Sequence, residues 1–335
     1  MKIAIHHRPG SFSDHWIQYC VEHGIEYKLV NAYSSGIIEM VSDCQAFMWH
    51  HHQYDYRDVL FAKQLLYSLE SRGIHCFPDF RTTWHFDDKV GQKYLLEAIG
   101  APLVPSYVFY TKKDALEWIA NTCFPKVFKL RGGSGAANVK LVHNAGEARH
   151  LVKKAFGKGF PQFDRVGYLK ERYRKWHEGK DSLIGVFKGL GRIIIPTEFA
   201  EMHGVEKGYA YFQDFIPNND YDIRVVVIGN KAIGEKRYVR KGDFRASGSG
   251  QFEYVPLQES ILQVAFNTAK LLQTQSVAFD FVFRDNDPLL VEMSYGFGTH
   301  GISHCGGYYT DDLQWHEEKE PNFCGWMVDL IIKEQ

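Results

Sequence analysis

The stretch VAFDFVFRDNDPLLVEMS, residues 277–294, places two acidic residues inside two otherwise apolar strands that flank a polar turn. If the connection is Asp285 to Asp287, antiparallel pairing sets Asp280 directly opposite Glu292. Two carboxylates so placed repel, and burial removes their hydration unless a divalent cation lies between them or one is protonated. The pattern therefore predicts a Mg²⁺ site. The alternative is a half-exposed hairpin whose polar face is acidic.

The composition is typical of a globular enzyme of two or three lobes. The 335 residues are 45% hydrophobic and carry a formal net charge of −1, so no overall charge attracts nucleic acid or an anionic membrane. The six cysteines form no CxxC pair, and the opening MKIAIHH is not typical of a signal peptide. No apolar run approaches the roughly 20 residues of a membrane helix. We expect a cytoplasmic protein with reduced thiols that binds neither nucleic acid nor membrane.

Strands and helices alternate along the first 86 residues, which predicts a small parallel α/β layer. Two of its strands end in polar clusters, His6-His7-Arg8 and Trp49-His50-His51-His52. Ligands bind at the carboxyl ends of such strands, so one or two of these histidines could contact a substrate. Adjacent strand residues point to opposite faces, so the three histidines cannot all bind one metal. The alternative is a strand end that only completes the core.

A second unit begins near Asp87 with a helix that Gly100 ends. Farther on, a strand carrying Lys129 leads into a glycine-rich loop from Arg131 to Asn138, and a second strand follows. Glycines let backbone N–H groups surround an anion, and Lys129 adds a fixed positive charge. The segment therefore predicts a phosphate-binding loop, although a simple hairpin turn is the alternative. It is not a Walker loop, because no Gly-Lys-Ser/Thr follows.

The order of these pieces resembles the ATP-grasp superfamily, and within it the RimK and glutathione synthetase-like carboxylate–amine ligases. The pieces in question are Lys89, Lys129 with its glycine loop, QDFI, DIR, KR, GDFRASGSG, Asp280 and Glu292. The resemblance covers residues 87–301 and implies an ATP-grasp fold preceded by a Rossmann-like α/β domain. The implied domains are 1–86, an ATP-grasp central lobe at 87–212, and a C-terminal lobe with the metal site at 213–335.

The resemblance also implies which residues contact ATP. Lys89 and Lys129 resemble the two lysines that reach the phosphates, and a mobile loop closes over them through Gly132, Gly133, Ser134 and Gly135. The segment Gln213-Asp214-Phe215-Ile216 resembles the interlobe hinge, whose backbone bonds the adenine edge near Gln213 or Asp214 and Ile216. Asp220, just past the hinge, is the candidate for the ribose hydroxyls.

The remaining implied roles concern the metal and the chemistry. Asp280 and Glu292 match the carboxylates that bind Mg²⁺. Basic positions near the transferred phosphate and the acceptor are matched by Arg224, Lys236 and Arg237. The chain departs from the family at Ser294, where relatives commonly have an asparagine whose amide oxygen helps to bind a second Mg²⁺. A serine hydroxyl is a poorer ligand, so one metal or two are both compatible with the sequence.

Two further segments have alternative interpretations. The insert at about 159–207 is rich in arginine, lysine, tyrosine and tryptophan, and either receives an anionic or sugar-bearing substrate or forms a basic surface helix. The loop from Gly242 to Phe252 is either a catalytic flap that delivers Arg245 or a solvated connection.

The implied activity is ATP-dependent joining of a small-molecule carboxylate to an amine through an acylphosphate. Arg224 or Arg237 would then stabilise the oxyanion, and no nucleophilic side chain is required. The aromatic insert favours a carbohydrate or cell-envelope precursor as substrate, and relatives often form homodimers. The alternatives are an ATP-grasp kinase and a nucleotide-binding regulatory protein without ligase turnover.

Overall fold

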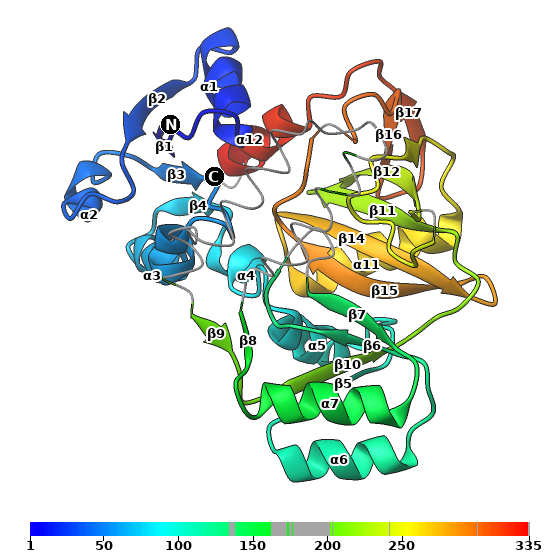
Figure 1. The fold of residues 1–335 in the computed structure, drawn as a ribbon. Coiled ribbons are helices and arrows are strands. Elements are labelled where there is room, and N and C mark those ends of the chain that lie inside the picture. The colour runs from blue at the N-terminus through cyan, green and yellow to red at the C-terminus, as the bar shows by residue number, and fades with distance from the viewer. Residues whose placement is uncertain are drawn as a thin grey trace. The chain divides into compact units, whose positions relative to one another are not determined.

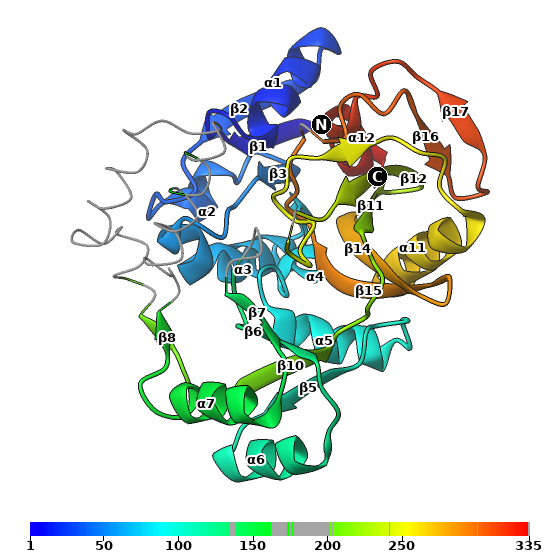
Figure 2. The ribbon, with the colours of Figure 1, turned by 45° about the vertical axis from the view of Figure 1, so that its right-hand side comes forward.

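The computed structural model describes residues 1–133, 138–161, 173, 176, 202, 204–240, 242–299 and 301–333. Contacts between residues divide the chain into two compact units (Figures 1 and 2). The first unit comprises Met1–Val104 and Ile216–Gln335, and the second comprises Pro105–Phe215. The three domains expected at 1–86, 87–212 and 213–335 stay a prediction, because contact units need not coincide with domains.

The amino-terminal part of the first unit is a parallel sheet in the order β2-β1-β3-β4, as the alternation of strands and helices predicts. Ser11 and Asp55 cap the two long helices by accepting hydrogen bonds from backbone N–H groups. The elements are β1 (Lys2–His6), α1 (Phe12–Glu22), β2 (Glu26–Val30), α2 (Ile37–Met40), β3 (Ala46–Trp49), α3 (Tyr56–Ser71), β4 (His75–Phe77), α4 (Phe80–Thr83) and α5 (Lys89–Ala98).

The carboxy-terminal part of the first unit is built on a seven-stranded antiparallel sheet. Its order is β15-β14-β11-β12-β16-β17, and β13 pairs with β12. The elements are β11 (Tyr221–Ile228), β12 (Lys231–Tyr238), β13 (Phe252–Glu253), α11 (Glu259–Leu272), β14 (Ser276–Arg284), β15 (Asp287–Ser294), β16 (Gly307–Thr310), β17 (Trp315–Glu317) and α12 (Phe323–Lys333).

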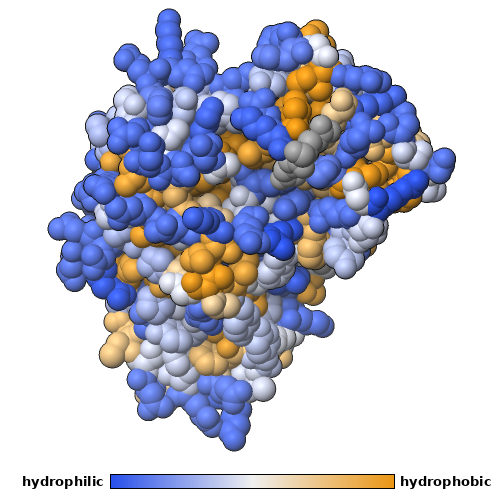
Figure 3. Space-filling model, turned by 180° about the vertical axis from the view of Figure 1, so that it is seen from behind, coloured by the Kyte–Doolittle hydropathy of each residue, from blue (hydrophilic) through white to orange (hydrophobic). Residues whose placement is uncertain are grey.

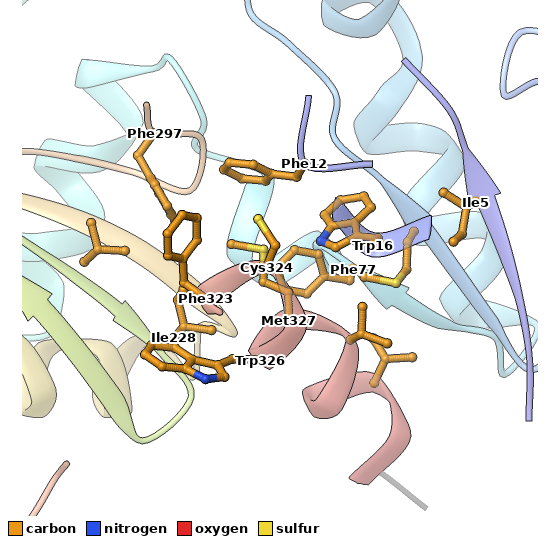
Figure 4. Close-up of a cluster of buried hydrophobic side chains, with 14 of the residues drawn as sticks. Ile5, Phe12, Trp16, Phe77, Ile228, Phe297, Phe323, Cys324, Trp326 and Met327 are labelled. Carbon is orange, nitrogen blue, oxygen red and sulfur yellow. The ribbon is translucent and has the colours of Figure 1, made fainter. Parts of the chain in front are cut away.

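Alternate residues of the central strands enter two different hydrophobic cores. Val225 and Phe279 belong to one face, which packs against α11. Val226 and Ala278 belong to the other face and share a core with α1 and α12. Figure 4 shows this second core, in which Trp16 of α1 and Met327 of α12 lie among the labelled side chains.

The hairpin of β14 and β15 places Asp280 opposite Glu292, which confirms the predicted pairing. The expected three-residue connection is wrong, because Asp285 and Asn286 alone form the turn, with φ of 51° and 73°. Two positive φ values are typical of the type I′ turn, whose twist matches that of the strands. A bulge next to Asp280 takes up the extra residue and restores the pairing.

The second unit contains an antiparallel sheet in the order β5-β10-β6-β7, with a core that includes residues of α6 and α7. Phe128 and Phe212 face this core, so their neighbours Lys129 and Gln213 point to the opposite face of the sheet. The elements are β5 (Ser106–Phe109), α6 (Lys112–Asn121), β6 (Lys126–Lys129), β7 (Val139–Val142), α7 (Ala145–Ala155), β8 (Phe160–Pro161), β9 (Val205–Glu206) and β10 (Ala210–Asp214).

No helix among the described residues is long and apolar enough to cross a membrane. On the side drawn in Figure 3, hydrophobic residues lie in patches that hydrophilic residues interrupt.

His50 and His51, the first two residues after β3, are buried. His50 stacks on Phe12 with a ring separation of 3.8 Å, and its Nδ1 accepts the Phe12 backbone N–H at 3.2 Å. His51 bonds Thr83, and its carbonyl accepts a hydrogen bond from Tyr295. These contacts favour the alternative in which the histidines at this strand end complete the core.

Burial lowers the pKa of His50 to about 3, with a smaller contribution from His52. Below pH 6.5 the unfolded chain takes up a proton that the folded protein excludes until about pH 3, so stability falls as the pH falls through this range. We expect His50 alone to cost about 2 kcal/mol of unfolding free energy between pH 7 and pH 5. Chemical denaturation of wild type and His50→Asn at both pH values measures this. The unfolding free energy lost between the two pH values should be smaller in His50→Asn than in wild type. His15→Asn changes an exposed histidine and should behave as wild type. An unchanged loss in His50→Asn would contradict the lowered pKa of His50.

Candidate active site

A row of ionisable side chains crosses the large sheet of the first unit. The row has one residue on each of four neighbouring strands. In strand order these are Glu292 of β15, Asp280 of β14, Arg224 of β11 and Glu235 of β12, each directly opposite the next. Arg224 alternates in phase with Val226, so the row lies on the face that forms the α12 core farther along the strands. The same face of the sheet is therefore apolar where it packs against α12 and charged farther along the strands.

A second row on the same face consists of Asp222 and Arg237, which lie opposite each other on β11 and β12. Arg237 binds Asp222 through Nε and one terminal nitrogen, both at 2.7 Å. It also contacts Asp280 at 2.9 Å, and Arg224 binds Asp280 through two nitrogens at 2.8 and 3.0 Å. Asp280 is thus paired with two guanidinium groups.

The pKa values of Asp222 and Asp280 follow from burial and from the charges of the neighbouring side chains. Burial raises the pKa of both Asp222 and Asp280, and the arginine charges oppose it. At Asp280 the charges of Arg224 and Arg237 outweigh burial, so its pKa lies below the usual range. At Asp222 the charge of Arg237 does not compensate for burial, and the pKa is raised.

Glu292 is paired with a lysine from a distant part of the sequence. Lys89 is the first residue of α5, and Asp88 caps that helix by accepting the Gly91 N–H at 2.9 Å. The Lys89 Nζ lies 3.0 Å from Glu292 Oε1, and only 5% of the lysine side chain is exposed. Burial lowers the pKa of Lys89, but Glu292 and Asp87 more than compensate and raise it. Lys89 is therefore a charged lysine next to a predicted metal carboxylate.

These ion pairs correct one premise of the sequence argument. The repulsion between Asp280 and Glu292 does not require a metal, because Arg224, Arg237 and Lys89 already supply positive charge. Among the described residues no three His, Cys, Asp or Glu side chains are grouped to hold a metal ion. The predicted third ligand, Ser294, donates its hydroxyl to the Gly296 carbonyl at 2.6 Å. The metal assignment of Asp280, Glu292 and Ser294 stays a prediction.

In the second unit, the predicted nucleotide residues Lys129 and Gln213 contact each other. The Lys129 Nζ donates to Gln213 Oε1 at 2.6 Å, and Gln213 donates to the Ser106 hydroxyl at 3.0 Å. The neighbouring Asp214 pairs with Lys126 at 2.6 Å. The antiparallel pairing of β10 with β6 thus brings the start of the predicted hinge next to the predicted phosphate lysine.

The other predicted nucleotide residues that the structure describes lie in loops. Gly132 and Gly133 follow β6, and Gly133 has φ of 116°, which favours glycine. Ser134 and Gly135 lie outside the described residues, as does most of the 159–207 insert. Phe215 and Ile216 lie on either side of the boundary between the two units, and Asp220 is exposed just before β11.

Two predicted catalytic residues lie apart from the charged rows. Lys236 neighbours Arg237 on β12 but points to the opposite face, where it lies over the rings of Tyr221 and Tyr238. Arg245 is paired with Asp243 at 2.6 Å in the loop between β12 and β13. Conversely, the sequence analysis did not select Glu235, although its position two residues before Arg237 places both on one face of a strand.

Comparison with known proteins identifies this architecture. Residues 200–311 match the model of a RimK-like ATP-grasp domain. This part of the chain is a RimK-like ATP-grasp domain. A RimK domain ATP-grasp protein from Sphaerobacter thermophilus has a similar fold, with a TM-score of 0.62 and 17% identity over 98% of both chains. D-alanine–D-alanine ligase from Bacillus anthracis has a TM-score of 0.55 and 13% identity over 88% of this chain and 85% of its own. The predicted superfamily and fold class are confirmed.

Curated relatives match only part of the chain. A probable alpha-L-glutamate ligase from Vibrio atlanticus is 29% identical over 135 residues, which are 38% of this chain and 45% of the relative. The same protein from Vibrio vulnificus strain YJ016 is 29% identical over 34% of this chain and 41% of the relative. The chain thus matches less than half the length of these relatives.

Proposed function

We propose that this protein is an ATP-dependent carboxylate–amine ligase that forms an amide bond through an acylphosphate. The observation that carries the proposal is the row of Glu292, Asp280 and Arg224, with Lys89 paired to its end, on a RimK-like ATP-grasp domain. The names of the relatives, which are probable ligases, support the same reaction class.

The residues of the row fit the charges that such a reaction handles. Lys89 would bind a phosphate oxygen, while Arg224 and Arg237 would balance the charge that develops on the transferred phosphoryl group and on the oxyanion. The carboxylate oxygens of Asp280 and Glu292 are hard ligands that suit Mg²⁺. When bound, Mg²⁺ would neutralise phosphate charge. Lys129, Gln213 and Asp220 stay the candidates for nucleotide contacts.

The decisive experiment measures ADP formation with pools of carboxylates and amines, followed by mass spectrometry of the product. L-Glutamate is the first amine to include, because the relatives are named alpha-L-glutamate ligases. An amide product with one ADP per bond is expected. A phosphorylated product without an amide would instead identify an ATP-grasp kinase. ATP binding without ADP release for any pair would contradict the ligase proposal and favour a regulatory protein.

The loop 242–250 provides a separate prediction about closure. Glycines and serines give it little side-chain packing, so ordering costs about 1–2 kcal/mol of backbone entropy per residue until a ligand offsets the cost. We expect hydrogen exchange of Gly242–Gly250 to be fast in the free protein and to slow when ATP and acceptor are both bound, with the same change at Arg131–Asn138. The β14–β15 turn at Asp285 and Asn286 serves as the control that ligands leave unchanged. Strong protection without ligand would show that these loops are fixed hairpins and that Arg245 is not delivered by a flap.

A further inference from the structure

Glu235 is a buried carboxylate in the active-site row that lacks the partners its neighbours have. The residue is 5% exposed, and its Oε2 has no hydrogen-bond partner among the described residues. Asp222 and Asp280, on the same face, each bind an arginine through both oxygens. A buried polar atom without a partner is costly, so this oxygen requires an explanation.

Among the described residues of the two rows, carboxylates outnumber the cations that pair with them. Three carboxylates, Asp222, Asp280 and Glu235, share the two guanidinium groups of Arg224 and Arg237, while Lys89 lies with Glu292. One negative charge is therefore left without a matching cation in this group, and it lies at the Glu235 end of the row. Burial raises the pKa of Glu235 against the opposing charges of Arg224 and Arg237, as expected for a carboxylate without a paired cation.

The backbone around Gly301 forms one side of this position. A Cβ added at Gly301 would lie 2.1 Å from Glu235 Oε2, so any other residue here would displace the carboxylate from its present position. The Tyr254 hydroxyl donates to the Gly301 carbonyl and thereby fixes this wall. On the other side, Glu235 lies opposite Arg224, whose side chain is 21% exposed and pairs with Asp280 on the next strand. The carboxylate thus lies next to the groups assigned to the acyl transfer.

We propose that Glu235 binds the ammonium group of the amine substrate and accepts its proton. This inference rests on the proposed ligase function. An ammonium group would supply the missing positive charge and N–H donors for the unpartnered oxygen. After one proton passes to Glu235, the nitrogen lone pair attacks the acylphosphate carbonyl. The C–N bond forms, the bond from that carbon to the phosphate oxygen breaks, and inorganic phosphate leaves with the second proton that the nitrogen loses.

The test compares a cationic amine with an uncharged one in Glu235→Gln, which keeps the shape of the side chain and removes its charge. L-Glutamate, whose amine is a charged ammonium group, is called the cationic amine here. Hydroxylamine is uncharged at neutral pH and traps the acylphosphate as a hydroxamate. We expect the variant to raise the KM for the cationic amine at least about tenfold, the effect of roughly 1.4 kcal/mol. The KM for ATP and the rate of hydroxamate formation should stay within about twofold of wild type, and Glu235→Asp should recover part of the loss. Glu317→Gln, an exposed change on β17 of the same sheet, is the matched control.

Two outcomes of these kinetics would overturn the role of Glu235. One is an unchanged KM for the cationic amine. The other is an equal loss with both amines in a folded variant, which would assign Glu235 to an earlier step. If L-glutamate is not a substrate, the comparison uses the amine that the ADP screen identifies.

A binding measurement separates this inference from the proposed function if the wild type forms no product. Carbon-13 labelling of glutamate side chains, with the Glu235 signal assigned by its absence in Glu235→Gln, reports the carboxylate directly. Methylammonium chloride should shift this signal, and tetramethylammonium chloride, which has no N–H donor, should not at the same ionic strength. No shift with methylammonium would reject the ammonium site. A shift without any ligase activity would keep the site and reject the ligase proposal.

Discussion

Replacement of Asp280 by asparagine is expected to reduce Mg²⁺-dependent ADP formation by at least about 10²–10³-fold, the usual effect of removing one electrostatic group from a reaction centre. The change removes the charge that both Arg224 and Arg237 contact, and it weakens the proposed metal site. Because those arginines then face a neutral amide, we also expect the unfolding free energy to fall by about 1–3 kcal/mol. Steady-state kinetics and denaturant titration measure the two effects.

Glu292→Gln should lower turnover to a similar degree with a smaller loss of stability. Glu292 is 31% exposed, and an amide oxygen can still accept a hydrogen bond from Lys89. Asp285→Asn in the turn of the same hairpin is the control, because asparagine tolerates the positive φ at that position. Wild-type ADP formation by both Asp280→Asn and Glu292→Gln would remove the proposed metal and phosphate site.

Loss of the Lys129 ammonium is expected to weaken ATP binding about 10- to 150-fold, which corresponds to a charge-assisted contact of roughly 1.5–3 kcal/mol. Lys129 is 4% exposed and donates to Gln213, so the charge is held in one position. Lys129→Met removes the charge and retains most of the side-chain length, and Lys129→Ala removes both. Calorimetry with ATP and with adenosine should show a large loss for ATP and a small one for adenosine.

Lys140→Ala is the matched control for this experiment. Lys140 is an exposed lysine on β7, the strand that pairs with the Lys129 strand. Its replacement should change neither ligand. Equal losses for ATP and adenosine in both Lys129 variants would place Lys129 away from the phosphates.

The sequence was sufficient to predict the fold because its periodic patterns and its motif order agree. The apolar runs VAFDFVF and PLLVEMS around a polar turn indicate the hairpin, and Asp280 lies opposite Glu292 as expected. The length of the turn was wrong, because a bulge adds a residue to one strand without a signal in composition. The local sequence pattern therefore predicts that Asp280 and Glu292 are paired, but it does not predict the turn length or the bulge.

The partners of the site residues could not be predicted, because they depend on which strands become neighbours. Asp280 meets Arg224 only because β14 pairs with β11, and Lys89 reaches Glu292 across some 200 positions of sequence. The sequence analysis grouped Lys236 with Arg237 as neighbours in the chain, but a strand directs adjacent side chains to opposite faces. Glu235 was missed because a lone glutamate in a strand has no motif.

The core that joins α12 to the amino-terminal sheet has a consequence for biosynthesis. Among the described residues, the buried core on one face of that sheet consists of residues between 4 and 76, so it can form while the rest of the chain is still being made. The other face shares its core with Phe323, Met327 and Ile331, which are synthesised after the other buried residues of that core. Ile3, Ile5 and Trp16 therefore gain their full native cover only after this helix has been made, and until then that face of the sheet is partly exposed.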